Sequence, residues 1–273
     1  MEKMDRTDEQ LLETIADLHG IPEGSFNIRK NGKLLARNSD TDIEIVSKTD
    51  KDGIDIIVKP NVKNKSVHIP VLLTVGDFQD TVYNDFFIGE NSDVTIVAGC
   101  GIHNDTCGNA EHDGVHTFYV GKNAKVRYIE RHYANGSGTG KKVFDPVTKI
   151  CLKENSQFIL ESTQLGGVTY TDRKTYATVG KNAQLLVKEK ILTDGEEKAI
   201  TDFKVKLTGK NSRADIVSRS VAKGKSLQQF KSDMIGKNEC FGHVECDGIV
   251  LDGARIISTP KIDAVSPEAS LVH

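Results

Sequence analysis

The sequence predicts a predominantly β protein, a right-handed parallel β-helix (solenoid) with a small N-terminal α+β segment. A turn phrase recurs six times, alternating apolar and polar residues follow each copy, and no copy contains a convincing helix. A repeat of one turn and one strand is typical of a solenoid, in which each coil stacks on the next. The composition agrees, because Trp is absent and Gly reaches 24 of 273 residues, which disfavours a helical globule.

The first segment, residues 1–65, is expected to form one helix and a small sheet. Thr7 is the predicted N-cap and Gln10 completes a capping box. The apolar stripe of the helix consists of Leu11, Leu12, Ile15 and Leu18. Gly20 and Pro22 end the helix. Short alternating stretches separated by Asp-Gly and Asn-Gly turns then predict strands.

The second segment, residues 66–273, carries the repeats and is expected to form the β-helix core. The repeated Asn residues, spaced by 32, 32, 27, 29 and 27 positions, are Asn91, Asn123, Asn155, Asn182, Asn211 and Asn238. Asn and Gly tolerate the left-handed backbone conformation of a tight corner, and the alternation that follows gives a strand with one buried face. The hexapeptide period of left-handed β-helices is missing, which favours right-handed winding.

Charge and hydropathy exclude several classes of protein. The formal net charge of −3 mixes 36 basic with 39 acidic residues, so we expect no nucleic-acid partner. No apolar run approaches the roughly 20 residues of a membrane span. The charged N-terminus lacks a signal-peptide pattern, which predicts a cytoplasmic protein. Five cysteines do not indicate a disulfide framework, and reduced thiols or metal ligands are the better interpretations.

The densest group of metal-ligating residue types has the pattern C-x2-H-x3-C-x4-H-x3-H. Its members are Cys100, His103, Cys107, His112 and His116. Thiolate and imidazole ligands at such spacing suit zinc or iron. The segment 100–116 is rich in Gly and Asn, so we expect a mobile loop between two strands. It either folds around a metal, with zinc as the candidate, or remains a solvated corner.

A second group surrounds Cys246 in an alternating strand. Cys246 shares a face with Val244, and a buried core position is the default interpretation for a free cysteine. His243 and Glu245 point the other way, where they are either ligands or solvated polar groups.

The stretch that contains Cys246, GHVECDGIVLDGARIISTPKIDAVSPEASLVH at 242–273, resembles the SufB/SufD family of iron–sulfur cluster assembly proteins. The phrases IGENSDVTIVAGCGIH at 88–103, FYVGKNAKVRYIERH at 118–132 and GKNSRADIVSRSVA at 209–222 are similar to the same family. The resemblance covers roughly residues 66–273.

This resemblance implies a scaffold rather than an enzyme, built as a right-handed parallel β-helix that pairs with a second such subunit. It also implies an ABC-type ATPase (SufC) and a cysteine desulfurase as partners, and a transient iron–sulfur cluster at or near the subunit interface. The positions that it connects with cluster chemistry are Cys246, between Glu245 and Asp247, and His273.

A homodimer is the expected assembly of the β-helix subunits. The sequence ends at His273, before the glutamate and the helical ATPase-docking segment with which the family pattern continues. Two other functions remain open. One is a zinc-binding β-helix hydrolase that uses His112 or His116, and the other is a purely structural interaction module without metal.

Overall fold

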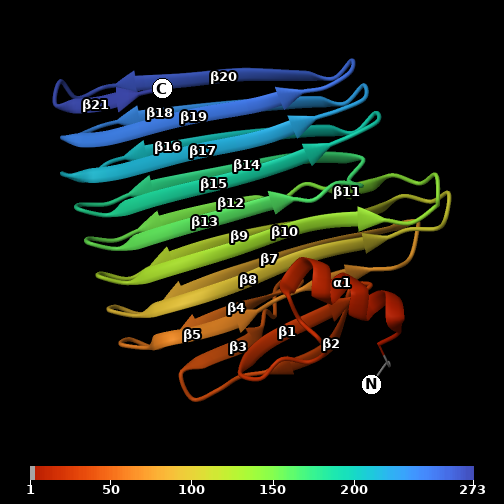
Figure 1. The fold of residues 1–273 in the computed structure, drawn as a ribbon. Coiled ribbons are helices and arrows are strands. Elements are labelled where there is room, and N and C mark those ends of the chain that lie inside the picture. The colour runs from red at the N-terminus through yellow and green to blue at the C-terminus, as the bar shows by residue number, and fades with distance from the viewer. Residues whose placement is uncertain (1–3) are drawn as a thin grey trace.

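The computed structural model describes residues 4–273 and shows a parallel β-solenoid of two facing sheets with one short helix at its N-terminal end (Figure 1). Among the described residues every strand pairing is parallel except β1–β2 and β3–β4. In Figure 1 the near strands run to the right and the far strands to the left while the chain climbs. The winding is therefore right-handed, as predicted.

Sheet A is the near sheet in Figure 1. Its strands in spatial order are β2 (Lys33–Asn38), β1 (Ser25–Lys30), β5 (Lys63–His68), β8 (Asp93–His103), β10 (Lys125–Asn135), β13 (Gln157–Gln164), β15 (Gln184–Thr193), β17 (Ser212–Ala222), β19 (Cys240–Val250) and β21 (Ala269–Val272), with β6 (Val71–Leu73) beside β1 and β8.

Sheet B lies behind it. Its strands are β3 (Ile43–Ser47), β4 (Gly53–Val58), β7 (Phe78–Ile88), β9 (Ala110–Val120), β11 (Lys142–Phe144), β14 (Tyr170–Val179), β16 (Lys198–Leu207), β18 (Leu227–Gly236) and β20 (Arg255–Ala264), with β12 (Val147–Leu152) beside β9 and β14. Because β4 and β5 pair with β7 and β8, the sheets run without a break across residue 65.

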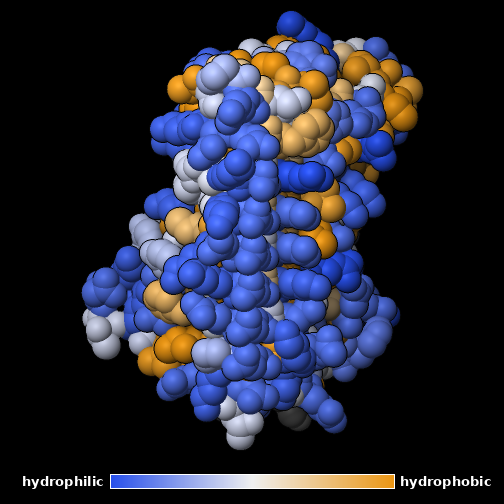
Figure 2. All heavy atoms as spheres, turned by 90° about the vertical axis from the view of Figure 1, so that its left-hand side faces the viewer, coloured by the Kyte–Doolittle hydropathy of each residue, from blue (hydrophilic) through white to orange (hydrophobic). Residues whose placement is uncertain are grey.

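The corners between sheet B and sheet A are built on the repeated asparagines. Five of the six predicted corner residues have positive φ, between 53° and 59°, namely Asn91, Asn123, Asn155, Asn182 and Asn211. Each donates from Nδ2 to the Oδ1 of the asparagine one coil below, at 2.9–3.1 Å, and the row starts at Asn61. We call this row the asparagine ladder. Figure 2 looks onto this edge and shows a column of hydrophilic residues along it.

Two corner residues differ from the sequence prediction. Asn61, which the repeat phrase did not include, has φ 65° and begins the ladder. Asn238 does not join it, and its Nδ2 instead donates to the Thr208 carbonyl oxygen at 3.5 Å.

The interior between the sheets is filled by in-facing side chains stacked coil upon coil. Phe86 and Phe118, in register on β7 and β9, stack with ring centroids 4.2 Å apart. Tyr128 and Phe158 from sheet A pack against Phe118. One continuous apolar cluster thereby runs from β3 to β21, so each coil depends on its neighbours for burial.

Helix α1 (Arg6–Ala16) packs on the outer face of sheet A, over β8 and β10. Its N-cap is Asp5, whose side chain accepts from the Asp8 amide, so the prediction of Thr7 as the cap was wrong. The predicted stripe Leu11, Leu12, Ile15 and Leu18 is buried. The helix lies so close that a Cβ on Gly99 would stand 2.4 Å from the Ile15 carbonyl oxygen. At 11 residues α1 is too short to cross a membrane, and the described chain has no other helix.

We predict that Asn123→Ala lowers the free energy of unfolding by about 1–3 kcal/mol, because alanine resists positive φ and removes two ladder hydrogen bonds. Asn123→Gly removes the same hydrogen bonds but keeps the conformation, so it is expected to cost less. Urea unfolding measures both, with Asn238→Ala as the control outside the ladder. Equal effects at 123 and 238 would show that the ladder does not stabilise the coils.

Candidate functional site

Cys246 lies on the inner face of β19, at the C-terminal end of the solenoid interior. The alternation of β19 buries Cys240, Gly242 and Val244 and leaves Cys246 half-buried. The next strand of sheet A, β21, pairs only with Cys240 to His243. Cys246 therefore lies just past the part of β19 that β21 covers, at the open end of the interior.

The Cys246 thiol has both apolar and polar neighbours, the apolar ones including Ile191, Phe230 and Ile256. It shares a small cavity, with room for about one water molecule (10 Å³), with Glu189, Thr201, Ser218 and Gln228. Burial raises the pKa of Cys246, Glu189 and Asp247 raise it further, and a hydrogen bond with Ser258 offsets part of the effect. The group is consequently a neutral thiol at pH 7 until a cation replaces its proton.

The other residues predicted around Cys246 do not point toward it. His243 and Glu245 project from the outer face of β19, where His243 Nδ1 lies 2.8 Å from Asp215 and Glu245 accepts from Arg219 at 3.1 Å. His273 follows directly after β21, whose last residue is level with His243. His273 therefore lies at the C-terminal end of the solenoid, as Cys246 does.

The segment 100–116 is not a loop, contrary to the sequence prediction. It comprises the end of β8, a six-residue connection at 104–109, and the start of β9. Strand alternation turns Cys100, His112 and His116 into the interior, whereas His103 and Cys107 are accessible to solvent. His103 binds Asn135 and Asp105 instead of a common centre.

These five residues therefore do not form a preassembled zinc site. Within residues 4–273, the single group of three or more His, Cys, Asp or Glu ligand atoms lying within 4.8 Å of one another is Glu111, Asp113 and Asp145, none of them in the predicted set. Exposed carboxylates commonly gather without a metal, so this group alone assigns no site.

Cys100 and His112 nevertheless come together inside the solenoid, beside Asp80 and Arg29. His112 Nδ1 lies 3.3 Å from Asp80, which Arg29 holds from the other side at 3.1 Å. Burial disfavours the charged imidazole, but Cys100 and Asp80 outweigh it and raise the pKa of His112 to about 10. The side chain of Cys100 here faces the His112 imidazole and, behind it, the Asp80 carboxylate.

His116 belongs to a different arrangement, in which both ring nitrogens are occupied. Its Nε2 accepts from Asn84 at 3.2 Å, and its Nδ1 donates to the Tyr128 hydroxyl at 2.6 Å, because that hydroxyl itself donates to Glu130 at 3.0 Å. Burial lowers the pKa of His116 to about 4, so the ring is neutral at pH 7. It has no nitrogen left for a metal.

A chain of buried polar contacts continues from there toward Cys246. Arg173 pairs with Glu130, and its Nε lies 3.8 Å from Glu189. Glu189 in turn accepts from Thr201 at 3.0 Å and from Ser218 at 2.7 Å. We call the series Asn84, His116, Tyr128, Glu130, Arg173, Glu189 and Ser218 the polar row. It ends at the cavity that contains Cys246.

Sequence reasoning missed the charged members of this row. In the sequence they can be recognised as charged residues at positions that share a face with buried apolar residues. Glu130 shares the inner face of β10 with Val126 and Tyr128, and Glu189 shares that of β15 with Leu185 and Val187. Burial alone would raise the pKa of Glu130, but Arg173 lowers it to about 2, so the pair stays charged inside the solenoid. Charges at in-facing positions of a solenoid thus indicate pairing across coils.

The buried histidines predict an acid-sensitive fold. Burial and Arg173 lower the pKa of His132 to about 3, so below the unfolded value of about 6.5 the unfolded chain takes up a proton that the folded interior excludes. Stability then falls toward pH 4 by about 1.4 kcal/mol per pH unit for each excluded proton. The contribution of His112 has the opposite sign, since it is present below pH 6.5 and is lost as the pH rises toward 10.

Urea unfolding between pH 4.5 and 6.5 checks this prediction. His132→Gln is expected to reduce the slope of the unfolding free energy against pH by one proton, and the exposed His19→Gln serves as the control substitution. An unaltered slope in His132→Gln would mean that His132 is protonated in the folded chain.

Comparison with known proteins matches residues 82–273 to the SUF system FeS cluster assembly, SufBD core domain. An iron–sulfur cluster assembly SufBD family protein of Archaeoglobus fulgidus is 29% identical over 88% of this chain and 64% of its own length. A homologue from Methanothermobacter thermautotrophicus (strain Winter) is 30% identical over 73% of this chain and 48% of its own length. A chloroplastic member from Arabidopsis thaliana is 23% identical over 74% of this chain.

The chain spans about half to two thirds of the length of the first two of these relatives. The family match covers the strands from β7 onward, including those that carry Cys100, the polar row and Cys246. A parallel β-solenoid with this match identifies the chain as a member of the SufB/SufD family of the SUF iron–sulfur cluster assembly system.

Proposed function

We propose that this chain is a scaffold subunit of SUF-type assembly, on which Cys246 binds sulfur and iron of a nascent cluster. The observation that carries the proposal is the position of Cys246, a thiol at the open end of the solenoid interior and at the end of the polar row. Thiolate is the soft ligand that iron–sulfur clusters take from proteins. The cluster is the cargo of the scaffold.

The raised pKa of Cys246 keeps the thiol protonated before iron binds. A neutral thiol is less readily oxidised than a thiolate, and iron binding supplies the energy that releases its proton. The cavity holds only about one water molecule, so a cluster has to form toward the open end, past β21, rather than inside the coil. Any further ligands therefore come from that end, where His273 lies, or from a second subunit.

The same proposal includes the partners of the family. An ABC-type ATPase, a cysteine desulfurase as sulfur source and a second β-helix subunit, in a homodimer or with a paralogue, would complete the assembly. The exposed apolar residues of the last coil outside the groove of sheet A, among them Ile262 (41% exposed) and Val265 (61%), support pairing of subunits there. A chain of this kind binds and presents its cargo, and the reactions belong to its partners.

Anaerobic reconstitution with ferrous iron and sulfide tests the role of Cys246. The wild type is expected to gain iron, sulfide and visible charge-transfer absorbance, and Cys246→Ala to lose most of all three. Cys151→Ala is the matched control, because Cys151 is exposed on β12. Metal analysis and absorbance on the three proteins give the result.

Equal loading of Cys246→Ala and wild type would overturn the assignment. In that case Cys100→Ala locates the alternative, since Cys100 is the interior thiol paired with His112. Circular dichroism of each variant shows whether the fold is retained.

A further inference from the structure

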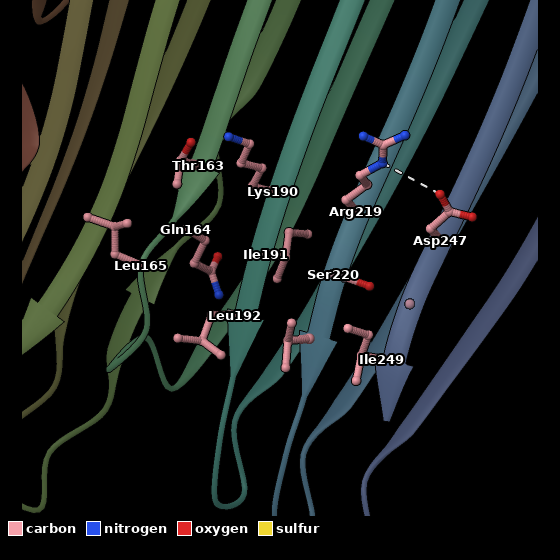
Figure 3. A pocket seen from close by; sticks show the side chains of 12 residues that line it. Thr163, Gln164, Leu165, Lys190, Ile191, Leu192, Arg219, Ser220, Asp247 and Ile249 are labelled. Atoms are coloured by element: carbon pink, nitrogen blue, oxygen red, sulfur yellow. Dashed lines mark ion pairs between the residues drawn. The ribbon is translucent and has the colours of Figure 1, made fainter. Parts of the chain in front are cut away.

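The outer face of sheet A carries an open groove near its C-terminal end (Figure 3). The groove measures about 600 Å³ and crosses β13, β15, β17 and β19. One side is a polar line that consists of Thr163, Lys190, Arg219 and Asp247. The other side is an apolar line that consists of Leu165, Leu192, Val221 and Ile249. Figure 3 shows the two lines side by side.

The apolar line is largely open to solvent. Leu165 is 38% exposed, Leu192 41% and Ile249 60%, although the three lie in one contiguous strip. Isolated exposed apolar side chains are ordinary, whereas a continuous strip rimmed by polar groups marks an interaction surface.

Helix α1 already packs on the adjoining part of the outer face of sheet A. The polar line continues onto β10 at Arg131, which is in register with Thr163. Tyr133, two residues further along the same face, extends the apolar line. Tyr133 packs against the apolar cluster of α1. Arg131 Nη1 lies 2.7 Å from Asp17, the C-cap residue of the helix. One end of the two lines is thus already covered by an amphipathic helix with an acidic edge.

At the uncovered end of the two lines, a basic residue again lies beside exposed apolar residues. Lys190 stands in the line of Arg131, and within residues 4–273 it has no ion-pair or hydrogen-bond partner. Arg219 is already held by Glu245 at 3.1 Å and Asp247 at 3.5 Å. The charge that the groove lacks is therefore one carboxylate beside Lys190. Four neighbouring strands span about 14 Å, the length of roughly ten helical residues.

We propose that this groove docks an amphipathic helix of a partner protein. The apolar stripe of that helix covers Leu165, Leu192 and Ile249, and an acidic residue at its edge pairs with Lys190. The docked helix continues the covering of sheet A that α1 begins.

The test uses a helix-stapled, fluorescein-labelled peptide of residues 4–19 as the probe, because this sequence already fits the adjoining part of the two lines. Fluorescence anisotropy with the full chain is expected to show saturable binding. Lys190→Glu weakens it about threefold or more, and the peptide variant Asp17→Lys recovers the loss. Leu192→Gln weakens it about fivefold or more, whereas Tyr176→Gln, a comparably exposed residue on sheet B, has no effect.

Three results would overturn the proposal. The first is absence of saturable binding. The second is binding that responds to Arg131→Glu but not to Lys190→Glu, because the peptide would then be replacing α1. The third is self-association of the chain in analytical ultracentrifugation that Leu192→Gln abolishes, because the occupant would then be a second copy. All variants are at exposed or half-exposed positions, and circular dichroism confirms that they fold.

Discussion

The register of the coils is the constraint on which the rest of the structure depends. From Asn61 to Asn211 each coil returns from sheet B to sheet A through a corner with positive φ, and the asparagine ladder fixes that corner directly above the one below it. Since side chains alternate with a period of two, a shift of one residue in any coil would turn its inner residues outward. With the corners aligned, equivalent inner positions stack, and Phe86 on Phe118 is one result.

The same stacking places ionisable groups of different coils next to each other. Glu130, Arg173 and Glu189 come from three strands, and each would be costly to bury alone. Together they form a paired series that neighbouring hydroxyls complete, so the interior is apolar on one side and polar along the polar row. That row leads to Cys246, which explains why a thiol on the inner face of a β-helix strand has Glu189 and Ser218 among its neighbours. The candidate site is in this sense a product of the coil register.

The solenoid, its handedness and five corner asparagines were predictable from the sequence, because turn chemistry is local and repeats. The prediction of a loop at 100–116 was wrong because its glycines resemble loop residues. Gly101 in fact lies on β8 against α1, where an added Cβ would stand 3.1 Å from Leu11 Cδ2. The prediction of Thr7 as the helix cap was wrong because two capping side chains lie close together in the sequence. Asp5, two residues earlier, caps as well as threonine does, and it is the residue that the helix uses. The polar row was not predictable in detail, since pairing Glu130 with Arg173 requires knowing which strands are neighbours.

Thiol mapping is the measurement that tests the account most directly. The chain is alkylated before and after anaerobic loading with iron and sulfide, and modification of each cysteine is read by mass spectrometry. If the cluster is built at the open end of the solenoid interior, loading protects Cys246 and leaves the exposed Cys107 and Cys151 as reactive as before. If Cys246 reacts equally in both states while the chain holds iron and sulfide, the cluster lies elsewhere and the central claim is wrong.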